Sequence, residues 1–397
     1  MARRVDMKAT FVYNYPCKVL FGPGMLKELH KESLPGKKAF VVIYEGQTPE
    51  NSPTVKTVKD ELEAAGAEVV LFDKISSNPE EPLIMEGSKL YHENGCDFIV
   101  GVGGGAILDA ATLISAIAGQ KDGRLWDYVQ GGTGGKRRLE SPPVPYIEIT
   151  TTAGTGSEVD PFGVVSNPDT GEKIGFTGAY PTIAVVDPEL MVTVPPLVTA
   201  YTGFDALYHS LEGLFNVNRT EYSEMIGRRA VYNVGHYLAR AVNDGSDIEA
   251  RTKVAFANTM SGYSMCMCGC LGIHVMANAM SGFHHNLPHG LAIAMISIAY
   301  YEYLIHKEAC PDEMFVDIAR LLGKEDATVP EDMITALRDL YKATGIDRIK
   351  MSDYGVVPDD FLPMVKDARA AAPHQFHRDP VYATEEELVE IYRASYR

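Results

Sequence analysis

The sequence has few basic residues relative to acidic ones and no apolar run long enough to cross a bilayer. Lys and Arg number 36 against 53 Asp and Glu, and the formal net charge at pH 7 is −17. An excess of negative charge repels phosphate groups. We therefore do not expect nucleic acid or an anionic membrane surface as a partner. The longest apolar run, residues 291–305, contains three tyrosines and a glutamate and falls short of a membrane span.

We expect neither a leader peptide nor a disulfide framework. Residues 1–16 contain two arginines but no apolar stretch after them, so we expect a cytoplasmic protein without a secretory signal. Six cysteines are too few to form a disulfide framework in a chain of 397 residues. Cys266, Cys268 and Cys270 alternate within a helical pattern, which would spread their sulfurs around the helix axis. We therefore do not expect a functional thiol there.

The apolar patterning predicts two kinds of architecture along one chain. In the first half, strand and helix patterns alternate, which is typical of a parallel α/β sheet. After residue 188 the spacing is helical, and neither an internal repeat nor a low-complexity linker interrupts it. We predict an α/β domain, Rossmann-like, over residues 1–193 and an all-α domain over residues 194–397. Expected strands lie at 37–44, 67–73, 97–102, 146–150 and 182–187, with strand material and turns at 11–24. Expected helices lie at 54–66, 82–95, 218–243, 247–279, 288–306, 312–322, 331–344, 359–372 and 385–396.

Two polar turns follow expected strands and have the composition of a dinucleotide site. The first contains Gly103, Gly104 and Gly105 before an apolar helix. Three glycines let the backbone approach a diphosphate, and the helix start favours its negative charge. Glycines are common in such turns and the GxGxxG fingerprint is not met, so this is a hypothesis. The second turn, residues 151–159 (TTAGTGSEV), is a plausible cradle for ribose and adenine, or a turn capped by Thr155 or Ser157.

Histidines gather in the second half of the chain. Residues 271–290 contain four of them, and His274 and His289 are expected on consecutive helices joined by a loop. Upstream, Asp205 and His209 are four residues apart and share one face of a helix. One carboxylate oxygen and three imidazole nitrogens suit Fe(II), Zn(II) or a similar ion, and leave coordination positions for a substrate.

With these motifs, nearly the whole chain resembles the iron-containing alcohol dehydrogenases, which are metal-dependent NAD(P) enzymes. The family has an Asp, a His four residues later and two further His, the last within Pro-His-Gly. Its Thr-Thr-Ala-Gly-Thr-Gly-Ser-Glu motif matches residues 151–158 completely. The resemblance implies the dehydroquinate-synthase-like fold of that family, with metal and nicotinamide meeting between two domains. It also implies four metal ligands, namely Asp205, His209, His274 and His289.

The resemblance further assigns residues to the cofactor. A glycine-rich phosphate loop with an Asp after it matches Gly103 to Gly105 and Asp109, although Ala106 replaces the family's Ser. Asp160 stands where the family usually has Thr, so a contact near the nicotinamide is expected to differ. The remaining cofactor contacts that the resemblance implies are Asn78, Thr151, Thr152, Ser157 and Lys173.

The implied chemistry is hydride transfer between nicotinamide and a small primary alcohol or aldehyde. The metal would lower the pKa of the alcohol, and the cofactor would carry the hydride. Glu45 follows the first strand of the expected domain, where an acidic residue favours a free ribose 2′-hydroxyl. NAD is therefore preferred, with NADP open, and Fe(II) is expected with Zn(II) as the alternative.

Three other functions remain open from the sequence. A glycerol-dehydrogenase-like zinc enzyme would differ mainly in its metal. A dehydroquinate-synthase-like lyase would use a Glu-led ligand set, from which the Asp205 and His209 pair points away. A nucleotide-binding protein that had lost catalysis would keep the glycine turn but lose ligands.

Two expectations concern proton transfer and assembly. The family commonly has a second His four residues after the third ligand, and this chain has Asn278 there, which cannot titrate. Water, His284 or His285 would then carry the proton. Residues 11–21 have too few expected partners nearby to be a free sheet edge, so we expect a homodimer or an assembly of dimers.

Overall fold

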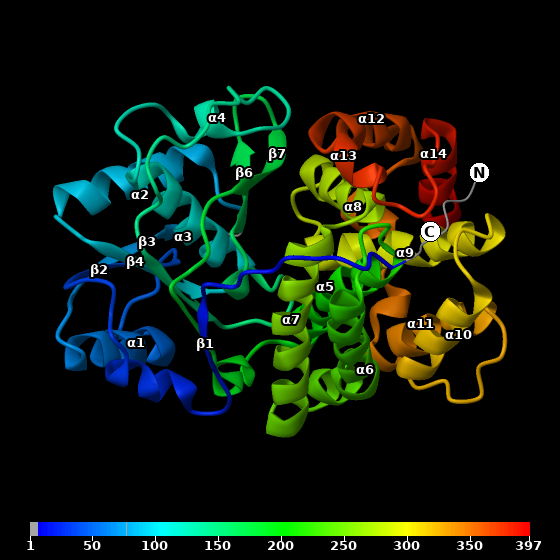
Figure 1. The fold of residues 1–397 in the computed structure, drawn as a ribbon, viewed down its shortest axis with the longest axis horizontal. Helices are drawn as coiled ribbons and strands as arrows, with labels where there is room; N and C mark the ends of the chain where they lie inside the picture. Colours follow the sequence, from blue (N-terminus) through cyan, green and yellow to red (C-terminus); the bar gives the residue numbers. More distant parts are fainter. Residues whose placement is uncertain (1–6, 77) are drawn as a thin grey trace. The chain divides into compact units, whose positions relative to one another are not determined.

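The structure is a computed structural model that describes residues 7–76 and 78–397. It divides into two compact units (Figure 1). The sheet unit comprises Asn14–Thr152 and Ser157–Val192, and the helical unit comprises residues 7–13, Ala153–Gly156 and Thr193–Arg397. These units differ from the predicted ranges 1–193 and 194–397 in two short segments and at Thr193, all of which group with the helical unit.

A six-stranded sheet is the centre of the sheet unit. Its order is β1-β8-β5-β4-β2-β3, and every neighbouring pair is parallel. The predicted parallel α/β architecture is confirmed. Consecutive strands β2 and β3 run to one side while β4 continues on the other, which creates a topological switch point between β2 and β4. The strands are β1 (Lys18–Phe21), β2 (Lys38–Tyr44), β3 (Glu68–Ile75), β4 (Phe98–Gly103), β5 (Tyr146–Thr150) and β8 (Ile183–Val186).

Helices cover both faces of this sheet, and the central strands β2 and β4 are apolar along most of their length. On β2, Phe40 and Val42 face a core shared with α2 (Glu81–Glu93) and α3 (Gly105–Ala118). The alternate residues Val41 and Ile43 face the core under α1 (Pro53–Ala64) and the 3-10 helix η1 (Met25–Lys31). Figure 1 shows α1 on one side of the sheet and α2 and α3 on the other. A sheet buried on both faces explains the unbroken apolar runs that predicted the strands.

An antiparallel hairpin in the sheet unit was not predicted. It consists of β6 (Phe162–Asn167) and β7 (Glu172–Thr177), and buried positions alternate along β6. Its turn ends at Gly171, whose φ of 72° lies in the left-handed region that favours glycine. The surrounding short elements are α4 (Leu125–Tyr128), η2 (Ser157–Val159) and η3 (Pro188–Met191).

The N-terminal segment was predicted as strand material, but only its last part forms a strand. Residues 11–17 do not pair in a sheet, and β1 is an edge strand that pairs with β8. Within the helical unit, Tyr13 forms a 3.0 Å hydrogen bond with Thr220, and the ring of Phe11 stacks 6.0 Å from that of Tyr222. The segment therefore finds partners in its own chain, and the homodimer stays a prediction.

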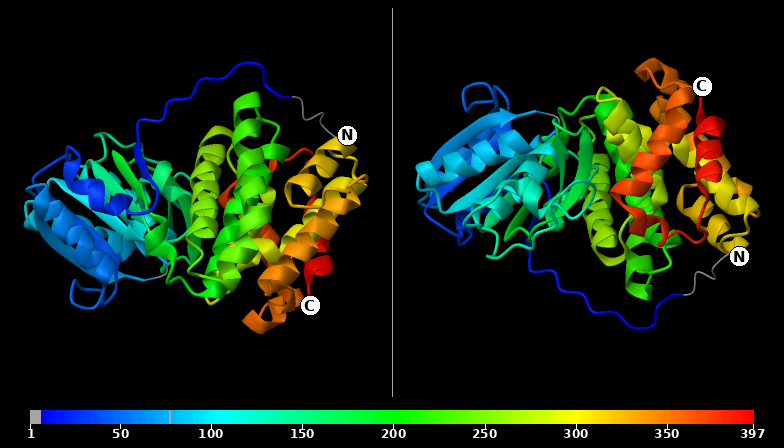
Figure 2. Two further views of the ribbon diagram at one scale, coloured as in Figure 1. Left: turned by 90° about the horizontal axis from the view of Figure 1, so that it is seen from below. Right: turned by 90° about the horizontal axis from the view of Figure 1, so that it is seen from above.

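Packed helices form the helical unit around one continuous apolar core. Helices α5, α6 and α7 contact one another, and α8 and α9 pack together beside α12 and α14 (Figure 2). The helices are α5 (Pro196–Phe215), α6 (Glu221–Asn243), α7 (Ile248–Cys268), α8 (Gly272–Phe283), α9 (His289–His306), α10 (Asp312–Leu321), α11 (Glu331–Thr344), α12 (Phe361–Ala371), α13 (Pro373–Phe376) and α14 (Glu385–Ser395). Three 3-10 helices separate α11 from α12: η4 (Ile346–Arg348), η5 (Met351–Tyr354) and η6 (Pro358–Asp360).

The predicted helix over residues 247–279 is wrong, because the chain breaks between α7 and α8. Gly269 has φ 73° and the two helices are bent by 111°. In the described part of the chain, no single helix is long and apolar enough to cross a membrane. Among the described residues, α7 and α8 taken together reach that length and composition, across this bend.

Candidate metal centre

One face of α5 carries three buried side chains that can serve a metal. Asp205, His209 and Glu212 follow one another at steps of four and three residues, which place them on one helical stripe. The first two are each 4% exposed and Glu212 is 0% exposed. Such polar burial on an otherwise apolar helix is costly unless partners satisfy it.

The second pair of predicted ligands starts the two later helices. His274 lies in the first turn of α8, and His289 is the first residue of α9, with Pro288 as its N-cap. The Nε2 atoms of the two histidines are 2.9 Å apart, and His289 Nε2 lies 3.5 Å from Asp205 Oδ1. On α5, His209 Nδ1 lies 3.9 Å from the same carboxylate oxygen, and its ring stacks on His274 with centroids 4.5 Å apart.

These distances fit a divalent ion. Two ligands each about 2.1 Å from one tetrahedral ion are about 3.4 Å apart, which is close to the observed spacings. The donor atoms fall into two overlapping groups, each within 4.8 Å. One contains Asp205, His274 and His289, and the other contains His209, Cys270 and His274. The structure thus gathers the four predicted ligands around a shared His274 and adds a thiol.

The imidazoles of His209 and His274 are held in the form that binds metals. Burial lowers the pKa of His209 well below its ordinary value, and the neighbouring His274 lowers it further. Burial also lowers the pKa of His274 to about 4. Both rings are therefore neutral at pH 7, and a neutral ring has a lone pair for a cation.

Glu212 orients His274, and the sequence analysis missed it. Its Oε1 lies 3.0 Å from His274 Nδ1, and its Oε2 accepts a 2.6 Å hydrogen bond from the Leu271 N–H. Burial raises the pKa of Glu212 well above its ordinary range, and the Leu271 bond acts against this. A carboxylate on Nδ1 fixes the tautomer that leaves Nε2 for a metal. The signal was the helical step of three from His209 to Glu212.

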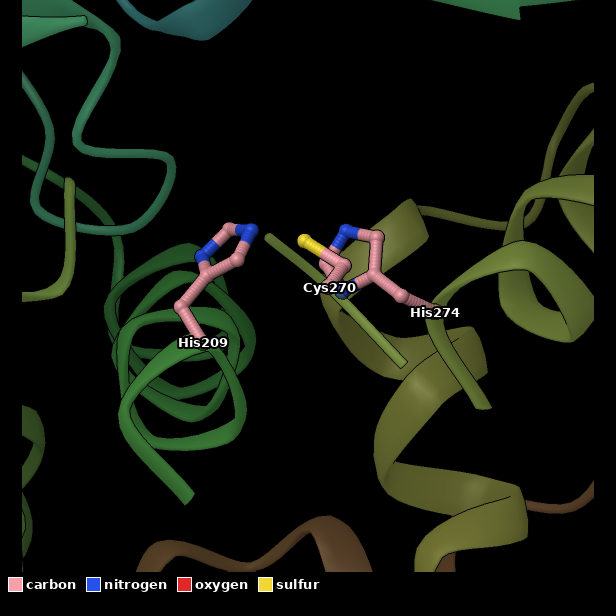
Figure 3. A group of neighbouring side chains, drawn as sticks. All are labelled: His209, Cys270 and His274. Carbon is pink, nitrogen blue, oxygen red and sulfur yellow. The ribbon is translucent and has the colours of Figure 1, made fainter. Parts of the chain in front are cut away.

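Cys270 does not lie in the helix on which the sequence analysis based its expectation for this thiol. The expectation assumed one continuous helix through Cys266, Cys268 and Cys270. Because α7 ends at Cys268, Cys270 lies in the turn before α8 and its side chain reaches His209 and His274 (Figure 3).

The predicted cofactor residues line the carboxyl edge of the sheet. Gly103 ends β4, Gly104 is the N-cap of α3 and Gly105 begins that helix. A Cβ on Gly104 would lie 3.0 Å from Thr152 Oγ1 and 3.2 Å from the Tyr44 hydroxyl, so this turn is enclosed by the ends of β5 and β2. The Thr151 N–H donates a 2.9 Å bond to the Gly103 carbonyl. Glu45 is exposed after β2, at the switch point.

Four other predicted cofactor residues form two contacting pairs in the sheet unit. Lys173 on β7 donates a 3.2 Å hydrogen bond to Asn78, and Ser157 donates a 3.4 Å bond to Asp109. Burial raises the pKa of Asp109 to about 7, while a Val164 backbone bond and the charge of Lys173 act against this. The hairpin that the sequence analysis missed thus delivers Lys173 to the predicted site.

Buried acids surround Asp109. Burial raises the pKa of Glu148 on β5 and of Asp160 well above their ordinary values, and the nearby Asp109 and Glu158 add repulsion at both. Glu148 accepts a 3.0 Å hydrogen bond from Thr112. Asp160, at the position where the resembled family usually has Thr, is therefore part of a cluster of buried acids. The sequence analysis considered position 160 by itself and did not predict this cluster.

The three predicted proton-transfer residues have different surroundings. Asn278 is partly buried on α8, one turn after His274. The Nε2 of His284 lies 3.1 Å from an oxygen of Asp360 in η6, and His285 is exposed. Proton transfer through any of them stays a prediction.

Comparisons with known proteins cover both halves of the chain. Residues 16–188 match the family model "Iron-containing alcohol dehydrogenase", and residues 199–396 match "Fe-containing alcohol dehydrogenase family, C-terminal". The 1,3-propanediol dehydrogenase of Klebsiella pneumoniae is 30% identical, over 97% of this chain and 99% of that protein. The NAD-dependent methanol dehydrogenase of Bacillus methanolicus is 31% identical, over 95% and 97%.

A solved structure agrees with these matches. An archaeal halo-thermophilic Red Sea brine pool alcohol dehydrogenase superimposes with a TM-score of 0.89 at 31% identity, over 98% of this chain and all of that chain. The fold, the match of both family models and the similarity over nearly the full length all point to one group of oxidoreductases. The chain is an alcohol dehydrogenase and belongs to the iron-containing alcohol dehydrogenase family.

Proposed function

We propose that Asp205, His209, His274 and His289 hold one catalytic divalent ion, with Fe(II) preferred and Zn(II) as the alternative. The convergence of these donors is the observation that carries the proposal, since His289 Nε2 lies 2.9 Å from His274 Nε2 and 3.5 Å from Asp205 Oδ1. Neutral buried imidazoles and a carboxylate are the ligands expected for Fe(II). Glu212 is the outer partner that keeps His274 in the productive tautomer.

The dinucleotide is proposed to bind at the carboxyl edge of the sheet, over the glycine turn after β4. Free N–H groups at the start of α3 favour a diphosphate, and the switch point between β2 and β4 is where open α/β sheets bind such ligands. Glu45 at the end of β2 favours a free ribose 2′-hydroxyl, which supports NAD over NADP. Lys173 and Asn78 contact each other there and offer a cation and an amide to the ribose.

The residues around the metal ligands are proposed to position the substrate and to provide a path for its hydroxyl proton. The bound ion would polarise the alcohol or carbonyl oxygen, and nicotinamide would exchange the hydride. Asn278, one turn after His274, can hydrogen-bond a substrate hydroxyl but cannot accept its proton. The proton is therefore proposed to leave through water or through His284 or His285.

The substrate is proposed to be a small primary alcohol or its aldehyde. Relatives named for methanol and 1,3-propanediol support this size class. We further propose a cytoplasmic enzyme that assembles as a homodimer or as several dimers.

Metal reconstitution combined with cofactor assays tests the proposal. Apoprotein is loaded with Fe(II) or Zn(II), and oxidation of NADH and NADPH is followed against a panel of short aldehydes. We expect turnover only after metal is restored, and higher efficiency with NADH. Asp205→Ala should lose metal and turnover yet still bind dinucleotide, because the predicted cofactor residues belong to the sheet unit. Full turnover of the metal-free protein would refute the assignment.

A further inference from the structure

The turn between α7 and α8 places a thiol beside two imidazoles of the metal centre. The Cys270 side chain is 7% exposed, and its sulfur lies within 4.8 Å of nitrogens of His209 and His274. Figure 3 shows a ring nitrogen of His209 facing the sulfur, with the His274 ring on the other side. The His209 ring is 4% exposed, and its Nδ1 has no hydrogen-bond partner in the part of the chain that the structure describes. A soft donor thus joins a site otherwise built from oxygen and nitrogen.

Buried side chains fix the backbone on both sides of this thiol. The amide of Asn216 donates hydrogen bonds to the carbonyls of Cys268 and Gly269, at 3.2 and 3.0 Å. After Cys270, the Leu271 N–H donates to Glu212. The sulfur is consequently held near the imidazoles by the protein itself, which reduces the entropy lost when a metal binds there.

A glycine is required for the chain to turn at this point. Gly269 has φ 73°, and a Cβ on it would lie 1.9 Å from a guanidinium nitrogen of Arg378. Backbone strain and a steric clash both act against any larger residue. The turn that exposes Cys270 to the histidines is therefore a fixed feature of the packing.

We propose that the chain has two metal-binding modes that share His209 and His274. Fe(II) takes the oxygen and nitrogen donors of the proposed function, whereas Zn(II) takes His209, Cys270 and His274. Thiolate and imidazole donors suit zinc, while imidazoles together with a carboxylate suit Fe(II). When the Zn–S bond forms, the thiol proton passes to solvent. The inference rests on the proposed function, because both modes use the same centre.

X-ray absorption at the metal edge separates the two modes without measuring activity. The wild type is loaded with Zn(II) or with Fe(II), and the variants are Cys270→Ser and Cys270→Ala. The matched control is Cys268→Ser, which makes the same change two residues away, at a buried thiol that hydrogen-bonds Ser223. Iron binding by each variant, measured alongside, shows that its centre is folded.

We expect a sulfur scatterer at about 2.3 Å from Zn(II) in the wild type and in Cys268→Ser. The sulfur signal should be lost in both Cys270 variants and be missing from the Fe(II)-loaded wild type. Zinc surrounded only by nitrogen and oxygen would overturn the inference and leave the proposed metal centre intact. Sulfur bound to Fe(II) as well would overturn the selection between modes. A wild type that retains neither metal would refute the proposed function itself.

Discussion

Replacing Glu212 with Gln puts an amide in place of the carboxyl group that orients His274, with almost no change in shape. The two oxygens of Glu212 serve different donors, since Oε1 faces His274 Nδ1 and Oε2 faces the Leu271 N–H. A Gln side chain has one oxygen, so its amide group must face one of these two positions. If the oxygen stays with Leu271, the amide donates to Nδ1, and His274 moves its proton to the nitrogen that should bind the metal.

The expected loss of metal affinity in Glu212→Gln follows from this change of tautomer. Loss of an outer partner of a metal-bound histidine typically costs 10- to 100-fold in metal affinity, which is about 1.4 to 2.7 kcal/mol. Leaving one buried donor unsatisfied instead costs about 1 to 3 kcal/mol, a similar amount. We therefore expect Glu212→Gln to fold and to bind Fe(II) or Zn(II) roughly 10- to 100-fold more weakly than the wild type.

Asp379→Asn provides the matched control. Burial raises the pKa of Asp379 to about 8, and one of its oxygens accepts bonds from both the Gly272 N–H and the Tyr300 hydroxyl. An Asn oxygen can accept both bonds, so metal affinity should stay near that of the wild type. Affinity is measured by competition with a chelating dye, and folding by thermal unfolding of the apoproteins. Wild-type affinity in Glu212→Gln, or an equal loss in Asp379→Asn, would refute the argument that the tautomer is controlled by Glu212.

Three further outcomes are expected. Gly104→Val should weaken NADH and NADPH binding alike in fluorescence titrations, because its side chain meets Thr152 and Tyr44 at the turn; unchanged affinity for both would place the diphosphate elsewhere. Burial raises the pKa of Asp109 from 3.8 to about 7, so its folded form retains a proton that the unfolded chain releases, and stability should fall as pH rises from about 4 to 7. Asp109→Asn should remove this loss of stability, which is up to roughly 4 kcal/mol at pH 8. Thermal unfolding at pH 4 and pH 8 measures it, and a variant no more stable than the wild type at pH 8 would contradict the expectation. If a loop histidine carries the proton, His284→Ala or His285→Ala should lower turnover by roughly 10²-fold and remove a limb of the pH–rate profile, whereas two unchanged profiles would assign the proton to water.

Local patterns in the sequence determined the features that depend only on residues close together in the chain. Apolar runs predicted the strands of the parallel sheet, because a sheet covered on both faces leaves no polar alternation. The step of four from Asp205 to His209 placed both on one stripe of α5, since helical periodicity is fixed by the backbone. The glycine turn after β4 was likewise visible, because a glycine-rich strand-to-helix turn is encoded within a few consecutive residues.

Tertiary packing decided which residues from distant parts of the chain contact one another. Glu212 and His274 are 62 positions apart, so their contact depends on how α5 and α8 pack, and no local pattern records it. A side chain at Gly269 would meet the guanidinium of Arg378, more than a hundred residues later, and the bend at Gly269 turns Cys270 toward the histidines. A helical pattern read through residues 247–279 placed that sulfur wrongly, because periodicity describes a helix only as far as the surrounding side chains let it continue.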